Sequence, residues 1–158
     1  MSSSEKKYIS MSSARLFAVQ AVYQMVENED NAANVVHDFL NSRIEQALHQ
    51  EKDMAAPDKE YFSKIVTGAE SRQDDLVSIL DGALKAVEEG SAIAKTKKRE
   101  PLLYAIFVCG AYELLAHHEI EAPIIINDYL NVGHAFFDGG EVKLINGTLD
   151  KVSKSVRD

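Results

Sequence analysis

The chain has 158 residues, of which 46% are hydrophobic and 27% charged, and these proportions exclude wholesale disorder and a membrane-embedded protein. Its 25 acidic and 17 basic residues give a formal net charge of -8, which argues against strong binding to nucleic acid of any sequence, because such affinity comes mainly from neutralising phosphates. The longest nearly apolar run, 101–111, is about half the length that crosses a bilayer, and no signal peptide pattern opens the chain, so we expect a cytoplasmic protein.

The first eleven residues are rich in serine and lysine and poor in apolar side chains, which predicts a flexible tail over 1–11 and a single helical domain over 12–158. The domain opens with an amphipathic helix that starts at Ser12 or Ser13 and ends around Glu27. Its apolar residues recur at intervals of three and four: Leu16, Val19, Tyr23 and Val26.

A second helix is predicted after the polar stretch 28–31, and it ends in the charged connector 49–57. Its apolar face consists of Val36, Phe39, Leu40, Ile44, Ala47 and Leu48. The pair Pro57-Asp58 then resembles a helix start, and the helical period continues through Val87 to about Glu88. This segment forms either one long helix or two pieces bent near Gly68.

The densest basic cluster follows, and it forms either a solvated loop or helix end, or a binding patch: Lys95, Lys97, Lys98 and Arg99. Residues 102–115 are apolar almost all round, which predicts the central helix of a bundle. Cys109 lies within this helix and is interpreted as a buried packing thiol.

Two more helices complete the prediction. One runs from about Pro123 to Phe137 and ends at the turn 138–140; its expected buried residues are Ile126, Leu130 and Phe137. The last carries a stripe with two apolar residues per turn between Val142 and Val156. No segment alternates with period two, so the fold class is all-α, without strands.

The sequence contains no pattern typical of a catalytic or metal-binding site. His117 and His118 are adjacent, so they point about 100° apart on a helix and cannot share a ligand site. No phosphate-binding glycine loop or nucleophile motif occurs, and the acidic residues of the C-terminal half show no working pair. We therefore expect a protein that binds macromolecules, with no enzymatic activity, cofactor or metal.

Some residues break the helical pattern without a visible packing reason. Arg15 is the only charge between Lys7 and Glu27, and Gln20 lies in an otherwise apolar run. Asn146-Gly147 interrupts the last helix, where both residues lower helix propensity. Close helix approach at Gly147 and a cap or buried hydrogen bond at Asn146 are the structural interpretations, and direct function is the alternative.

Four motifs along the chain resemble the NusB family of transcription antitermination factors, and they occur in the family's order and nearly its spacing. They are Ala14-Arg15-x-x-Ala18-Val19-Gln20-Ala21-Val22-Tyr23, Tyr112-Glu113-Leu114, Ile126-Asn127-Asp128 and Asn146-Gly147-x-Leu149-Asp150-Lys151. The resemblance implies a compact bundle of about seven helices in two subbundles.

The resemblance also implies a function. Such a protein pairs with the ribosomal protein NusE, the pair recognises boxA RNA, and with other Nus factors it helps RNA polymerase resist termination in ribosomal RNA operons. The residues that would face the RNA are Arg15, Gln20, Tyr23, Lys143 and Leu144. The alternative is a NusB-like protein-interaction module whose RNA binding is weak or lost.

The C-terminal helices contain more apolar residues than a lone bundle needs, so part of this surface is expected to bind NusE. A helix that starts at Pro123 cannot bury every side. Tyr129 and Phe136 are the expected anchors, and self-association through the same patch, giving a homodimer, is the runner-up.

Overall fold

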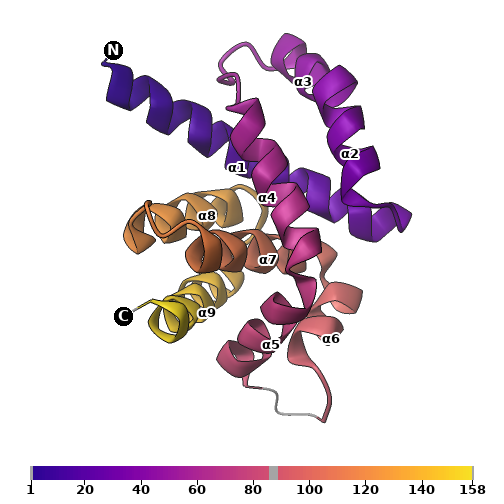
Figure 1. Cartoon of the computed structure of the whole chain (residues 1–158), viewed down its shortest axis with the longest axis vertical. Coiled ribbons are helices and arrows are strands. Elements are labelled where there is room, and N and C mark those ends of the chain that lie inside the picture. The colour runs from indigo at the N-terminus through magenta and orange to yellow at the C-terminus, as the bar shows by residue number, and fades with distance from the viewer. Residues whose placement is uncertain (1, 86–88, 158) are drawn as a thin grey trace.

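The protein is represented by a computed structural model that describes residues 2–85 and 89–157, and the regular secondary structure of these residues is entirely helical, with no strand among them (Figure 1). The helices are α1 (Ser3–Asn28), α2 (Ala32–Asp38), α3 (Ile44–Gln50), α4 (Lys59–Ser71), α5 (Gln73–Leu84), α6 (Ala92–Arg99), α7 (Pro101–Ala116), α8 (Ala122–Phe136) and α9 (Gly139–Val156). A π-helical turn, Phe39–Arg43, joins α2 to α3 without a break. The described residues therefore form eight helical rods, and the all-α prediction is confirmed.

Helix α1 begins at Ser3, so the expected helix start at Ser12 or Ser13 is wrong, and residues 3–11, expected as part of a flexible tail over 1–11, are helical. Ser2 caps the helix, because its side chain accepts a hydrogen bond from the backbone N–H of Glu5. Further along, the Tyr8 hydroxyl donates to Asp128 over 2.9 Å, and Ser10 accepts from the backbone N–H of Asp58. Serine and lysine do not break a helix, and these contacts with distant elements hold its first turns in place.

The segment that follows Asp58 forms two helices and not one. Arg72 leaves helical geometry, with φ -104° and ψ 19°, four residues after Gly68. Gly68 itself lies against α7: a methyl group at its Cα would come within 2.1 Å of the Tyr112 ring. The predicted end of this segment, Val87 and Glu88, lies outside the described residues.

Helix α7 is the centre of the fold, as predicted. It packs against α1, α4, α5, α6, α8 and α9, and its residues from Leu103 to Leu114 are buried, apart from the half-buried Tyr112. Cys109 is completely buried, in agreement with its interpretation as a packing thiol. Figure 1 shows α1 to α4 gathered on one side of this helix and α5, α6 and α9 on the other, which matches the two subbundles that the resemblance implied.

The buried face of α8 is rotated from the one expected. Ile125 and Tyr129 are completely buried, whereas Ile126, Leu130 and Phe137 are half-buried at the edge of the core. The turn expected at 138–140 is also shorter, because α9 already starts at Gly139. No helix within 2–85 or 89–157 is long and apolar enough to cross a membrane.

Candidate nucleic-acid interface

Arg15, the first residue expected to face RNA, points into the protein instead. Its side chain is 1% exposed, and α1 delivers it to the centre of the bundle together with Val19 and Val22, four and seven residues further along the same face. The guanidinium donates to both carboxylate oxygens of Glu113, at 2.9 to 3.1 Å, and Nη1 donates to Oδ2 of Asp128 at 2.7 Å. The prediction that Arg15 contacts RNA is therefore wrong.

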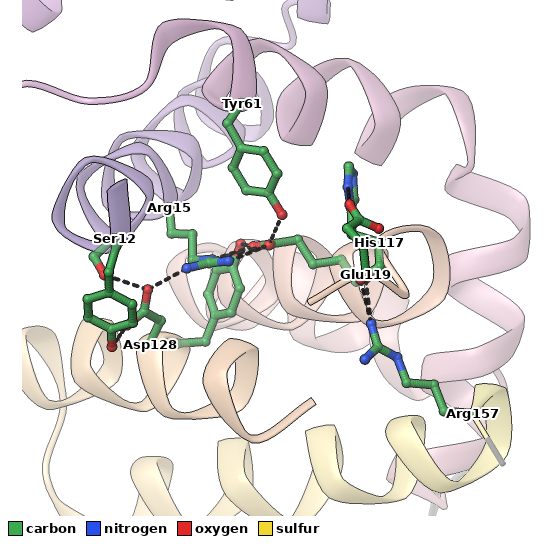
Figure 2. A network of polar contacts seen from close by, with 10 residues as sticks. Ser12, Arg15, Tyr61, His117, Glu119, Asp128 and Arg157 are labelled. Atoms are coloured by element: carbon green, nitrogen blue, oxygen red, sulfur yellow. Dashed lines mark hydrogen bonds and ion pairs between the residues drawn. The ribbon is translucent and has the colours of Figure 1, made fainter. Parts of the chain in front are cut away.

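Other buried groups complete this arrangement, as Figure 2 shows. The hydroxyl groups of Tyr61 and Tyr129 each donate to one oxygen of Glu113, and the Arg15 guanidinium lies 5.5 Å from the centre of the Tyr61 ring. Ser12 donates to Asp128 over 2.7 Å. We call Arg15, Tyr61, Glu113, Asp128 and Tyr129 the buried cluster; it joins α1, α4, α7 and α8.

The electrostatics of the buried cluster keep its hydroxyl groups protonated. Burial raises the pKa of Tyr129 and of Tyr61, and the neighbouring Glu113 carboxylate raises both further. Burial alone would lower the pKa of Arg15, but its hydrogen bonds and charge interaction with Glu113 outweigh burial and raise it. Burial likewise raises the pKa of the Cys109 thiol, so it is no nucleophile. Both oxygens of Glu113 already accept hydrogen bonds, so the cluster is built to hold helices together.

The sequence does contain a signal for this cluster. Arg15 shares a helical face with buried valines, and Glu113 lies within the almost wholly apolar 102–115 segment. An isolated cation on one apolar face and an isolated acid on another satisfy one another when both are buried. Glu113 and Asp128, two of the acidic residues in the C-terminal half, are both buried.

The other candidate RNA contacts are accessible in different degrees. On α1, Tyr23 is 37% exposed and Gln20 is half-buried. On α9, Lys143 is exposed and Leu144 is 46% exposed. Both helices pack against α7 and α8, which fixes the two groups of residues relative to one another.

Asn146 and Gly147 have no packing role. Both are exposed in the middle of α9, and a methyl group at the Gly147 Cα would meet nothing within 4 Å, so close helix approach is not its reason. Gly110 and Gly133 differ, because a methyl group there would lie 2.9 Å from Leu149 and 2.8 Å from Ile145.

The helix-propensity penalty at Gly147 therefore has no compensation inside the protein. A glycine inside a helix costs about 1 kcal/mol relative to alanine. Asn146 lies too far from the ends of α9 to cap them, and its side chain is not buried. Of the two interpretations open for this pair, direct function is the one that its surroundings favour.

Of the two expected partner anchors, the structure exposes one. Tyr129 is 0% exposed and bonded to Glu113, so the expectation that it anchors a partner is wrong. Phe136, at the end of α8, is 46% exposed. Ile124, near the start of the same helix, is also exposed.

The basic cluster of residues 95–99 forms the last turns of α6, in agreement with the interpretation as a helix end, where cations complement the negative end of the helix dipole. Lys97 lies 5.4 Å from the centre of the Tyr104 ring.

Among the residues that the structure describes, no three histidine, cysteine or acidic side chains gather as metal ligands would.

Comparisons with known proteins identify the family and agree with the all-helical fold. A family model described as the NusB family matches residues 12–154. The chain is 34% identical to the transcription antitermination protein NusB of Sphingopyxis alaskensis, over 96% of this chain and 97% of the relative. It is 33% identical to that of Novosphingobium aromaticivorans, over 91% and 93%. A solved structure of T. maritima NusB shares the fold, with a TM-score of 0.55, 16% identity, and coverage of 89% of this chain and 90% of that one.

Proposed function

Because the chain belongs to the NusB family, whose members are transcription antitermination factors and not enzymes, we propose that it pairs with ribosomal protein NusE and binds boxA RNA. In this role it acts in the cytoplasm with other Nus factors, and through them it helps RNA polymerase resist termination in ribosomal RNA operons. The observation that carries the proposal is family membership over residues 12–154 together with an exposed set of residues suited to single-stranded RNA.

The proposed RNA contacts are Tyr23 and Gln20 on α1 and Lys143 and Leu144 on α9. An exposed tyrosine ring offers a face on which an unpaired base stacks, and a glutamine amide can bond to a base edge. Lys143 supplies a cation for phosphate, and Leu144 supplies an apolar contact. Arg15 is not among these residues, because it lies in the buried cluster and forms its hydrogen bonds there.

The proposed partner surface includes Phe136, whose ring is exposed at the end of α8. A large aromatic side chain left in water at the end of a helix is typical of an interface anchor. We expect NusE to cover it. Self-association through the same surface remains the competing use.

One observation favours a second function, that of a protein-interaction module with weak RNA binding of its own. With Arg15 buried, Lys143 is the only cation in the proposed RNA contact set, and the chain as a whole carries a net charge of -8. Few phosphate contacts give little counterion release. The protein alone should therefore bind RNA weakly, as the second function requires.

A titration separates the two functions. A labelled RNA that carries boxA is titrated with the protein alone, then with an equimolar amount of NusE, at several salt concentrations. The first function predicts weak binding alone and at least tenfold tighter binding with NusE, with a shallow salt dependence. A one-to-one complex with NusE that adds nothing to RNA binding would establish the second function instead, and the absence of any complex would refute both.

Two variants locate the partner surface in the same experiment. Phe136→Ala should weaken the complex with NusE by about tenfold or more, since it removes an anchor, and should leave the helical content unchanged. Ile124→Ala, on the same helix and also exposed, is the matched control. Equal effects of the two variants would rule out Phe136 as the anchor.

A further inference from the structure

The exposed backbone at Gly147 is the feature of α9 that the fold itself leaves unexplained. Glycines that pack tightly in this protein have a neighbour where a side chain would stand, as Gly110 has Leu149 and Gly133 has Ile145. Gly147 has none within 4 Å, and its φ lies in the ordinary helical range. Neither packing nor backbone conformation requires a glycine here.

The residues around Gly147 form a face with a definite chemistry. Lys143 lies one turn earlier, and Asn146 is adjacent; both are exposed. Asp150, one turn later, is paired with Lys154 over 3.0 Å, so its charge is balanced within α9. Lys151 is exposed as well. The face is therefore locally positive, although the chain as a whole is acidic.

Among the residues described, the side chain of Asn146 forms no hydrogen bond and so offers both a donor and an acceptor to a ligand. Lys143 offers a cation, and Gly147 offers a bare stretch of backbone between them. A polynucleotide strand matches this combination, because it presents phosphate, sugar and base edges within a few ångströms of one another.

We infer that Gly147 is a contact point for the RNA strand, where a sugar or base lies directly on the α9 backbone while Lys143 holds a phosphate and Asn146 bonds to a base or 2'-hydroxyl. This inference rests on the proposed function and extends it, since it explains why a glycine stands where alanine would stabilise the helix. Any side chain at this position occupies the space of the strand. A glycine at this position therefore favours RNA binding but lowers the stability of the helix.

This opposition makes the inference testable, because one substitution should move the two properties in opposite directions. Gly147→Ala should raise the thermal unfolding midpoint by about 2 to 4 °C, as expected for a protein of this size. It should weaken binding of the boxA RNA to the complex with NusE by about tenfold. Gly147→Gln, with a larger side chain of high helix propensity, should weaken it further.

Gly82 supplies a matched control. It is also exposed within a helix, α5, and a methyl group at its Cα would likewise meet nothing within 4 Å. Gly82→Ala should raise the unfolding midpoint by a similar amount and leave RNA affinity within twofold of the original chain. Affinity for NusE, measured without RNA, should be unchanged in all three variants.

Each outcome decides the matter. Unchanged RNA affinity in Gly147→Ala and Gly147→Gln overturns the inference while the original chain still binds, and the proposed function survives. Loss of NusE affinity in these two variants also overturns it, because the face then serves the protein partner. A lower unfolding midpoint overturns the premise of open space at Gly147. If the original chain and Gly82→Ala fail to bind RNA with NusE, the proposed function itself has failed, and the inference fails with it.

Discussion

Arg15 and Tyr23 lie on the same helix, two turns apart, and both resemble residues that face RNA, yet the structure treats them in opposite ways. Arg15 enters the buried cluster and reaches two carboxylates on α7 and α8, whereas Tyr23 stays in contact with solvent. The two positions differ by about 80° around the helix axis, given 100° per residue. The comparison teaches that polarity alone does not place a side chain on the surface, because a charge that finds its counter-charges can occupy the core.

The largest expected effect is a loss of stability when the buried Arg15 is replaced. Arg15→Ala leaves Glu113 and Asp128 buried without their cation, so the free energy of unfolding should fall by about 3 to 5 kcal/mol. Urea unfolding followed by circular dichroism measures it. Lys143→Ala, an exposed charge on α9, is the control and should change stability by under about 0.5 kcal/mol. A stable Arg15→Ala protein that had lost only RNA binding would restore the original interpretation of Arg15.

A smaller loss is expected when one hydroxyl of the buried cluster is removed. Tyr129→Phe keeps the ring in place but deletes the donor that lies 2.5 Å from Glu113, and should lower the free energy of unfolding by about 1.5 to 3 kcal/mol. Tyr8→Phe deletes a donor to Asp128 from a side chain that is 42% exposed, so its effect should stay below about 1 kcal/mol. The same urea series serves both variants, and equal losses would show that burial does not set the strength of these bonds.

Replacing the exposed Tyr23 should instead affect the binding of RNA. Tyr23→Ala removes a stacking surface worth about 1 to 3 kcal/mol per base, so affinity for boxA RNA in the presence of NusE should fall by about fivefold or more. Stability should change by under about 1 kcal/mol, since the ring is exposed. Fluorescence anisotropy with labelled RNA measures the affinity. Tyr23→Phe keeps the ring and should retain most of the binding, and a loss as large as that of alanine would exclude stacking.

The smallest effect concerns alkaline pH. The pKa of Tyr61 is raised in the folded protein by burial and by Glu113, above its value of about 10 in the unfolded chain. A raised pKa favours the protonated, folded form, so this contribution is complete below pH 10 and is lost as the pH rises above it. The stability difference between the original chain and Tyr61→Phe should therefore shrink between pH 10 and pH 11 in urea unfolding. A constant difference would mean that Tyr61 does not titrate differently in the two states.

Much of the fold is visible in the sequence because it depends on local periodicity. The apolar character of 102–115 on every side predicts a helix with neighbours all round, and α7 has them. The stripe between Val142 and Val156 likewise predicts α9, whose Ile145, Leu149 and Val152 are completely buried. These predictions succeed because hydrophobic side chains at helical spacing leave one arrangement that removes them from water.

The start of α1 could not be predicted in this way, and the break after α4 was only one of two alternatives, one long helix or two pieces bent near Gly68. The polar residues 3–11 carry no apolar stripe, and their helix is held partly by the contact of Tyr8 with Asp128, 120 residues away. The break at Arg72 comes four residues after Gly68, which lies against the Tyr112 ring of another helix. In both places the contacts seen in the structure join residues that are distant in sequence.

The sequence by itself determined the helical class, the central helix, the family motifs and the unusual residues worth examining. Only the tertiary structure decided which of those residues are available to a ligand. Arg15 and Tyr129 are buried because Glu113 accepts hydrogen bonds from both. Glu113 lies 98 residues after Arg15 and 16 residues before Tyr129. The tertiary structure left Gly147 in open space. Helical periodicity is a local property of the chain, whereas the burial of a polar group depends on whether a distant partner compensates for the water it loses.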